Sequence, residues 1–373
     1  MATAIPATDE TAGHPRATAD LIGHERAERA VLDAFTAGRL HHAWLITGPR
    51  GVGKATLAYR IARFLLNQPA DTGPSLFDAP EPAADSLAVP PESPVFQRVA
   101  AGSHGNLLTI ERGWDDKRKV VRQEIVVDDV RRLHGFFGRT AAEGGWRVAI
   151  VDSADEMNRN AANALLKLLE EPPARSVLLL VAHAPGRLLP TIRSRCRRLD
   201  LKPLADRAVA DLVERRMADL AADDVALLAG LSDGAPGRAL SLAAAGGLEL
   251  YRVLVGTLAR LPQLDTPAAH ALAARLAGRA NDAAYRTFLA LTRDWIGRFT
   301  RALAAGEQPR ALVADEAPAI DRLAAAASLD RWVQVWEKMG RLAAEADAVN
   351  LDRKQTVLAT LFELRSAAAG RSG

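Results

Sequence analysis

The chain has 373 residues, 49% of them hydrophobic and 25% charged, and 48 Lys and Arg against 45 Asp and Glu give a net charge of +3. This composition is typical of a globular protein of two or three domains, and it excludes a histone-like polybasic protein but not a local basic patch. The single cysteine, Cys196, excludes a disulfide framework and a cysteine-based zinc site. We expect no membrane segment, because the longest strongly apolar run, 177–182, is too short, and no signal peptide, which favours the cytoplasm.

The first 200 residues alternate short apolar runs with helical patterns. Strands are predicted at 42–47, 107–110, 147–151, 177–181 and 198–201, and helices are predicted after Lys54, after Asp129 and over 160–171. Continuous apolar strands separated by helices indicate a parallel sheet that is covered on both faces. Beyond residue 203 the chain is rich in Ala and Leu, and this composition predicts helices. The fold class is therefore predicted to be α/β plus all-α.

Changes in composition suggest the domain boundaries. Residues 1–19 are expected to form a flexible tail, 20–202 the sheet domain, 203–247 a small helical domain and 248–373 a larger helical domain. Inside the sheet domain, 68–104 is an insertion whose prolines argue against a helix or a central strand over 68–94. We expect this insertion to be solvated.

A glycine-rich loop carries the strongest functional signal. Gly48, Gly51, Gly53 and Lys54 stand between a predicted strand and a predicted helix, with the spacing of a phosphate-binding P-loop. Backbone amides, the helix N-terminus and the lysine would bind nucleotide phosphates there.

One position of this loop is defective. A working P-loop has Ser or Thr directly after the lysine to bind Mg²⁺, whereas this chain has Ala55. Thr56 follows, but it lies about 100° further around the helix and cannot simply substitute.

These motifs, together with three further stretches, resemble AAA+ ATPases of the clamp-loader family. The stretches are Asp-Leu-Ile-Gly-His at 20–24, Ala-Asn-Ala-Leu-Leu-Lys-Leu-Leu-Glu-Glu-Pro-Pro at 162–173 and Thr-Ile-Arg-Ser-Arg-Cys at 191–196. Within the bacterial DNA polymerase III clamp loader, the defective loop is most similar to that of the delta-prime family. The resemblance implies a RecA-like AAA+ sheet domain, a helical lid and a C-terminal helical collar for oligomerisation.

The resemblance also defines a second defect. Asp152 ends the third predicted strand, where relatives have a metal-binding acid, but Ser153 follows where a hydrolysing relative would have Glu. After the fourth strand, His183 stands near the position at which active relatives carry Thr or Asn. We therefore expect ATP or ADP binding to be weak or vestigial, and hydrolysis to be absent.

Four arginines receive roles from the resemblance. Arg195 would be an arginine finger that reaches the γ-phosphate bound by a neighbouring subunit. Arg238 would contact bound nucleotide, or would only cap its helix. Arg131 and Arg132 are candidates for contacts with DNA phosphates, with a solvated basic face as the alternative. Cys196 is expected to be a small packed residue and not a nucleophile.

The implied partners are the delta and gamma/tau subunits of the clamp loader, the sliding clamp, and primer–template DNA bound without sequence preference. Relatives carry a four-cysteine zinc module where this chain has its insertion, so no zinc is expected. The preferred function is a stator subunit that does not hydrolyse ATP and supplies Arg195 in trans. The alternatives are an active gamma/tau-type ATPase and a sensor that binds ATP without hydrolysing it.

Overall fold

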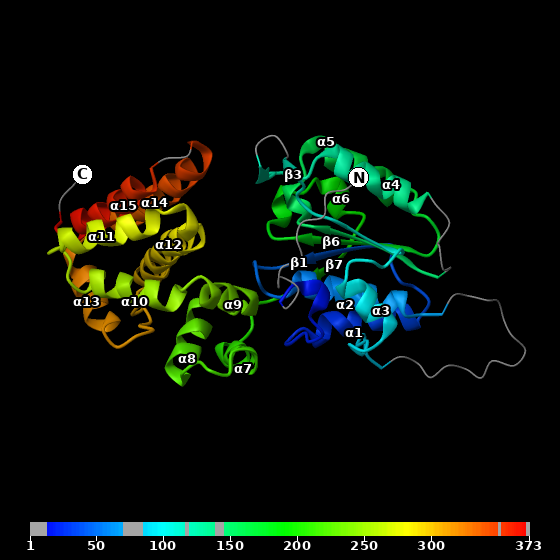
Figure 1. Cartoon of the computed structure of the whole chain (residues 1–373), viewed down its shortest axis with the longest axis horizontal. Helices are drawn as coiled ribbons and strands as arrows, with labels where there is room; N and C mark the ends of the chain where they lie inside the picture. Colours follow the sequence, from blue (N-terminus) through cyan, green and yellow to red (C-terminus); the bar gives the residue numbers. More distant parts are fainter. Residues whose placement is uncertain (1–12, 70–84, 116–118, 139–144, 350–351, 371–373) are drawn as a thin grey trace, which may run out of the picture. The chain divides into compact units, whose positions relative to one another are not determined.

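The computed structural model describes residues 13–69, 85–115, 119–138, 145–349 and 352–370. The chain divides into two compact units, residues 1–208 and 209–373. The first unit contains a parallel sheet and the second is helical (Figure 1). The expected fold class, α/β with a parallel sheet followed by helical structure, is confirmed. The separation of 203–247 from 248–373 stays a prediction.

Five strands of unit 1 form the parallel sheet, in the order β2-β5-β6-β1-β7. Their bounds lie within one residue of those predicted: β1 Ala43–Thr47, β2 Leu107–Ile110, β5 Arg147–Asp152, β6 Ser176–Ala182 and β7 Arg197–Asp200. Because the strands are parallel, their carboxyl ends meet at one edge of the sheet, where ligand sites of such sheets lie. The predicted P-loop directly follows β1 and is therefore at this edge.

Helices cover both faces of the sheet (Figure 1). Successive residues of a strand point to opposite faces, so Trp44 and Ile46 belong to one apolar cluster and Ala43 and Leu45 to the other. The first cluster is closed by α1 Glu25–Thr36, α2 Lys54–Leu66 and α3 Pro94–Ala100. The second is closed by α4 Val127–Phe137, α5 Arg159–Glu170 and α6 Pro190–Arg193.

The sequence predicts a solvated insertion, but part of this segment is folded and buried. Its end contains α3, which begins at Pro94 with the Ser93 side chain accepting the backbone N–H of Phe96 at 3.1 Å. Leu87 and Val89, ahead of this helix, are 1% and 7% exposed. Proline is tolerated in the first turn of a helix because its missing N–H would have no partner there. Residues 70–84 lie outside the described part.

The end of the predicted N-terminal tail is held by Arg63 of α2, which is 1% exposed. Its guanidinium donates to the backbone oxygens of Arg16 at 3.0 Å and Thr18 at 2.8 Å, and it lies 4.4 Å from the ring centre of Phe96. Residues 13–19 therefore differ from the flexible tail that the composition predicts, whereas 1–12 lie outside the described residues.

Between β2 and α4 the structure has a two-stranded antiparallel ribbon that the sequence analysis missed. It consists of β3 Trp114–Asp115 and β4 Val120–Val121, and Trp114 faces Val121 across it. Trp114, Val120 and Val121 are each about half exposed.

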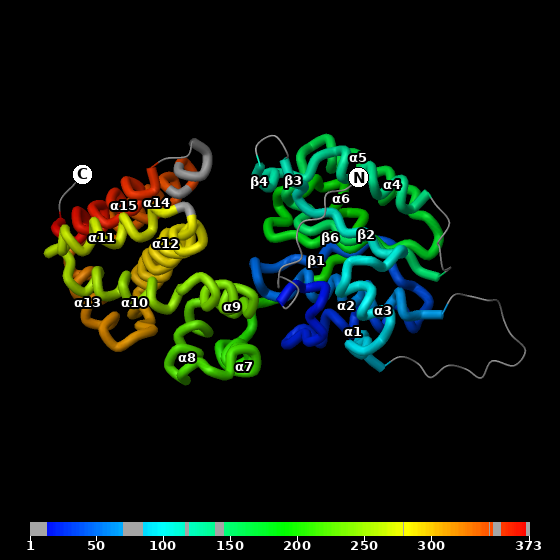
Figure 2. Tube along the Cα trace, in the orientation of Figure 1, coloured from blue at the N-terminus to red at the C-terminus, as the bar shows by residue number. Residues whose placement is uncertain are grey.

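Unit 2 is built from helices (Figure 2). After α7, Asp206–Arg216, which begins ahead of the unit boundary, they are α8 Ala222–Leu231, α9 Pro236–Ala244, α10 Gly247–Leu258, α11 Thr266–Ala277, α12 Asp282–Ala305, α13 Glu316–Ala326, α14 Leu329–Val349 and α15 Arg353–Ala368. Trp295 stacks on Phe299, which meets Trp332 edge-on. All three aromatic side chains are buried inside the unit.

A buried carboxylate lies beside these aromatics. Glu316, 1% exposed, accepts hydrogen bonds of 2.7 Å from the Tyr251 hydroxyl, the Trp295 indole and the backbone N–H of Leu312. The Arg298 guanidinium lies 3.7 Å away and offsets its charge. A buried charge needs such partners, and Glu316 thereby joins three helices and the loop before α13.

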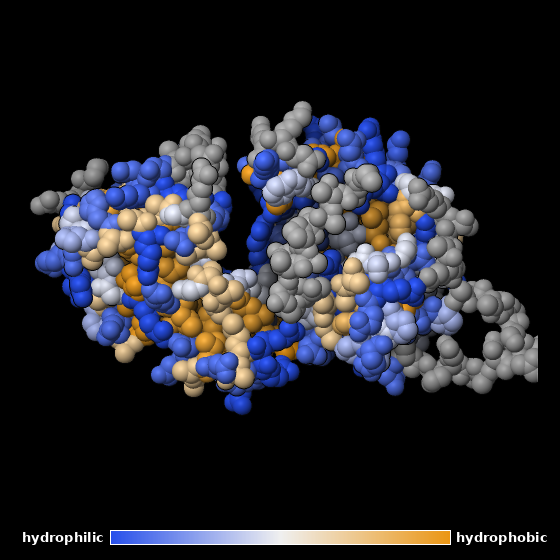
Figure 3. All heavy atoms as spheres, in the orientation of Figure 1, coloured by the Kyte–Doolittle hydropathy of each residue, from blue (hydrophilic) through white to orange (hydrophobic). Residues whose placement is uncertain are grey.

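Within the described residues, no single helix is long and apolar enough to cross a membrane, although α9 and α10, bent by 83°, meet that criterion together. Figure 3 shows apolar residues at the surface of unit 2, in the area that α10 and α12 occupy in Figure 1.

Candidate functional site

The predicted P-loop joins β1 to α2 at the carboxyl edge of the sheet. Gly48, Gly51 and Gly53 have φ angles of 142°, 78° and 110°, in the region that favours glycine. A side chain at Gly48 would also collide with the backbone oxygen of Leu201, which follows β7. The sequence pattern therefore corresponds to a tight loop whose glycines are required by backbone geometry.

The lysine of this loop bonds to the loop itself. Lys54 is 3% exposed, and its ammonium donates to the backbone oxygens of Gly48 at 2.8 Å and Pro49 at 2.6 Å. Burial lowers the pKa of Lys54 to about 8, although Asp152 and Asp155 favour its charged form. A phosphate group that bound here would have to replace these two hydrogen bonds. Thr56, the third residue of α2, is half-buried.

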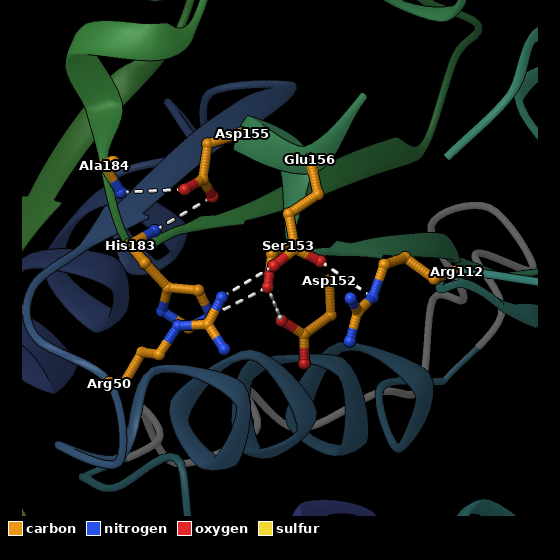
Figure 4. A network of polar contacts seen from close by, with 8 residues as sticks. All are labelled: Arg50, Arg112, Asp152, Ser153, Asp155, Glu156, His183 and Ala184. Carbon is orange, nitrogen blue, oxygen red and sulfur yellow. Dashed lines mark hydrogen bonds and ion pairs between the residues drawn. The ribbon is translucent and has the colours of Figure 1, made fainter. Parts of the chain in front are cut away.

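Next to the loop, Asp152, Ser153 and His183 are joined by hydrogen bonds (Figure 4). The Ser153 hydroxyl donates to Asp152 Oδ1 at 3.2 Å and lies 2.8 Å from His183 Nε2. A hydroxyl has one proton, so this arrangement fits a neutral imidazole that donates from Nε2. Burial raises the pKa of Asp152, and burial together with Lys54 and Arg50 lowers that of His183 to about 4.

Asp155, the other acid near the end of β5, has a structural task. Its two carboxylate oxygens accept the backbone N–H groups of His183 at 2.9 Å and Ala184 at 2.8 Å (Figure 4). Asp155 thus holds the turn after β6 and keeps His183 beside Ser153.

Glu156 links the P-loop to the neighbouring strand connection. Its carboxylate lies 2.6 Å from Arg50 of the P-loop and 3.0 Å from Arg112, which follows β2 (Figure 4). Sequence reasoning missed this link, although the charged Arg50 inside the glycine loop was a usable signal.

The motif at 20–24 packs against the same loop. His24 is 5% exposed, and its Nε2 lies 2.7 Å from the backbone oxygen of Val52. Leu21 and His24 also approach Gly53 on the side where a side chain would stand. The structure therefore brings together the predicted residues Gly48, Gly51, Gly53, Lys54 and Asp152, and adds Arg50, Glu156, Arg112 and His24.

Arg195 lies away from this cluster, between α6 and β7. Its guanidinium donates to the backbone oxygen of Thr191 at 3.2 Å and lies 3.0 Å from Glu170 of α5, and 38% of the side chain is exposed. Cys196 packs against the apolar cluster of this face, and burial raises the pKa of its thiol to about 12. This environment fits the expected packing role of Cys196 and disfavours a reactive thiolate.

The remaining predicted residues have partners of their own or are exposed. Arg238, near the start of α9 in unit 2, pairs with Asp233 at 3.0 Å and Asp294 at 2.5 Å. On α4 in unit 1, Arg131 pairs with Asp128 at 2.9 Å, and Arg132 is exposed.

Comparison with known proteins finds subunits of DNA polymerase III. Residues 23–205 match the family described as DNA polymerase III, delta subunit. The chain is 40% identical to the DNA polymerase III subunit delta' of Pseudomonas aeruginosa over 195 residues, 52% of this chain and 53% of that one. It is 33% identical to the Escherichia coli delta' subunit over 211 residues, 56% of each chain.

Other relatives are tau subunits, such as that of Salmonella typhimurium, which is 32% identical over 190 residues, 51% of this chain and 26% of that one. The chain thus spans about half the length of the delta' relatives and less of the tau relatives. Over residues 23–205 the chain is therefore similar to subunits of DNA polymerase III, and the relatives named delta' include the one at 40% identity.

Proposed function

We propose that this chain is a delta-prime-like stator of the replicative clamp loader. It would bind gamma/tau and delta subunits, help to place the sliding clamp on primed DNA, and supply Arg195 to the nucleotide site of a neighbouring ATPase subunit without hydrolysing ATP itself. The 40% identity to a delta' subunit supports this choice within the family.

The position of Arg195 relative to the P-loop carries the proposal. β1 and β7 are parallel neighbours, with Trp44 opposite Arg197 and Thr47 opposite Asp200. Arg195 precedes β7 and is therefore at the amino edge of the sheet, whereas the P-loop follows β1 at the carboxyl edge. In register, Arg195 is level with residue 42, six residues before Gly48, or about 20 Å along the strands. Arg195 is thus too far from this chain's own phosphate loop, and a phosphate that it stabilises would belong to another subunit.

The nucleotide site supports the absence of hydrolysis. Ala55 offers no hydroxyl to Mg²⁺, Ser153 stands where a water-orienting carboxylate would be needed, and its hydroxyl is engaged by Asp152 and His183. The self-bonded Lys54 further supports weak or vestigial binding of ATP or ADP. The P-loop glycines are retained, so a sensor that binds ATP without hydrolysing it is the alternative. Calorimetric titration with ATP, with and without Mg²⁺, tests this alternative. Binding below millimolar concentration would favour the sensor.

The DNA part of the proposal concerns α4. Arg132 is exposed, and Arg131 forms a surface ion pair with Asp128. Surface ion pairs are weak, so both arginines can bind DNA phosphates in place of solvent or of this pair. Such contacts position the duplex without reading its sequence, and their loss would lower the salt dependence of DNA binding.

The experiment that tests the proposal is ATP hydrolysis by the reconstituted clamp loader with clamp and primed DNA. Arg195→Ala is compared with Arg193→Ala, which removes an exposed arginine two residues away on the same turn. We expect Arg195→Ala to lower turnover at least tenfold at unchanged assembly, because the guanidinium stabilises transition-state charge, and Arg193→Ala to leave it within twofold. Equal turnover of wild type and Arg195→Ala would refute the role of Arg195 in trans.

A further inference from the structure

Two acceptors from neighbouring elements hold the guanidinium of Arg195. Nη1 donates to the backbone oxygen of Thr191 in α6 at 3.2 Å, and Nη2 lies 3.0 Å from Oε1 of Glu170 at the end of α5. Because the two contacts use different nitrogens, together they fix the plane of the guanidinium as well as its position. Arginine has five N–H donors, so three remain beyond these two contacts for a phosphate group.

Glu170 stands at a position that the electrostatics of its helix do not favour. It is the last residue of α5, which ends ahead of Pro172 and Pro173 because the residue before a proline avoids the helical conformation. The adjacent Glu171 caps the same end. The carboxyl end of a helix carries partial negative charge, so carboxylates are disfavoured there. The contact with the cationic Arg195 offsets this effect for Glu170.

The backbone on both sides of this pair is anchored in one apolar cluster. Leu169, directly ahead of Glu170, is 3% exposed, and Ile192, three residues ahead of Arg195, is fully buried. Both belong to the cluster on this face of the sheet, and Cys196 packs against it. The two charged side chains themselves are 38% and 49% exposed. They therefore extend from fixed backbone into solvent, where a group of another subunit can reach them.

A histidine from a third segment holds the end of α5. His42, directly ahead of β1, donates from Nε2 to the backbone oxygen of Leu169 at 3.2 Å. The last carbonyl groups of a helix have no partner within the helix, and this bond supplies one. The start of β1, the end of α5 and the turn before β7 thus meet at the amino edge of the sheet, around Glu170 and Arg195.

We propose that Glu170 is a positioning residue for Arg195: it holds the guanidinium so that the remaining N–H groups meet the γ-phosphate bound by the neighbouring subunit. This inference rests on the proposed function, which assigns Arg195 to that phosphate. A long side chain loses rotamer freedom when it binds, and one that is already held loses less. The benefit falls on kcat, because the charge that the guanidinium stabilises develops in the transition state.

The test is steady-state ATP hydrolysis by the reconstituted clamp loader with clamp and primed DNA, at varied ATP concentration. We expect Glu170→Ala to lower kcat about fivefold and to leave the KM for ATP within twofold, at assembly equal to wild type in sedimentation velocity. Glu170→Gln keeps an oxygen that can accept from Nη2, so it should recover at least half of the wild-type kcat. Glu171→Ala removes the neighbouring carboxylate of the same helix end and, as the matched control, should stay within twofold.

A double variant separates positioning from a general structural role. In the Arg195→Ala background, Glu170→Ala should change kcat by less than twofold, because the guanidinium on which Glu170 acts is gone. A loss of the same size in both backgrounds would overturn the proposal. An unchanged kcat of Glu170→Ala would also overturn it, and so would a raised one, which would mean that the carboxylate competes with the phosphate for Arg195. If Arg195→Ala alone leaves turnover unchanged, the proposed function fails, and the role of Glu170 fails with it.

Discussion

His183 should make unit 1 less stable in mild acid. Its pKa is about 4 in the folded protein, because burial and the nearby Lys54 and Arg50 disfavour the imidazolium, against about 6.5 in the unfolded chain. The unfolded chain therefore binds more protons between these values, so stability is complete above pH 6.5 and is lost as the pH falls toward 4. At pH 5 the two pKa values give a loss of about 2 kcal/mol, which partial solvent screening reduces to about 1–2 kcal/mol.

The assay compares wild type with His183→Gln, whose amide can hydrogen bond to Ser153 but does not titrate in this range. Urea unfolding at pH 7 and pH 5, followed by the fluorescence of the tryptophans, should show a smaller loss for the variant by about 1–2 kcal/mol, while all other histidines act equally in both proteins. Titration of the labelled imidazole by NMR should give a midpoint near 4. Identical pH dependence of the two proteins, or a midpoint above 6, would contradict the hydrogen-bonded neutral imidazole that we describe.

Three further outcomes follow from buried or missing groups. Glu316→Ala should destabilise unit 2 by about 3–5 kcal/mol in urea unfolding, because it leaves the Tyr251 and Trp295 donors and the Arg298 charge without their acceptor. Removal of the exposed Glu249 side chain should cost less than about 1 kcal/mol. Equal losses in the two variants would disprove the role of the Glu316 carboxylate. Arg63→Ala should release residues 13–18, so limited trypsin digestion should cut after Arg16 faster than in wild type; an unchanged rate would show that other contacts hold this segment. Ala55→Thr alone should not produce ATP hydrolysis, since Ser153 and the self-bonded Lys54 remain; measurable turnover by the isolated variant would show that the hydroxyl was the sole defect.

The sheet and the P-loop could be predicted because their signals are local. The strand segments at 177–181 and 148–151 are continuous apolar runs, which a sheet buried on both faces requires, and the glycines of the loop occupy φ angles that other residues avoid. Glu156 could not be placed in the same way, because its partners Arg50 and Arg112 come from segments that only the strand order brings together.

The proline rule holds over 85–93, where the structure has no helix or strand, but the expectation of a solvated insertion fails. Prolines argue against a helix interior, but Pro94 stands at the first position of α3, and Leu87 and Val89 ahead of it are buried. Composition counts the prolines and misses the apolar residues that the core requires. The hydrogen bonds of Lys54 to Gly48 and Pro49 also could not be predicted from the sequence, since they depend on the orientation of the loop carbonyl groups.

The opposite placement of Arg195 and the P-loop gives the subunit a polarity. Subunits that present a nucleotide site at one edge and an arginine at the other can combine only head to tail, and such a row either closes into a ring or stays open with two unlike ends. Under the proposed function, a subunit with a competent arginine and a defective P-loop can contribute to catalysis only at one end of such a row of subunits. It completes its neighbour's site and needs no arginine from a further subunit. An open row ended in this way has fewer working sites than subunits, and its direction is fixed before any DNA is bound.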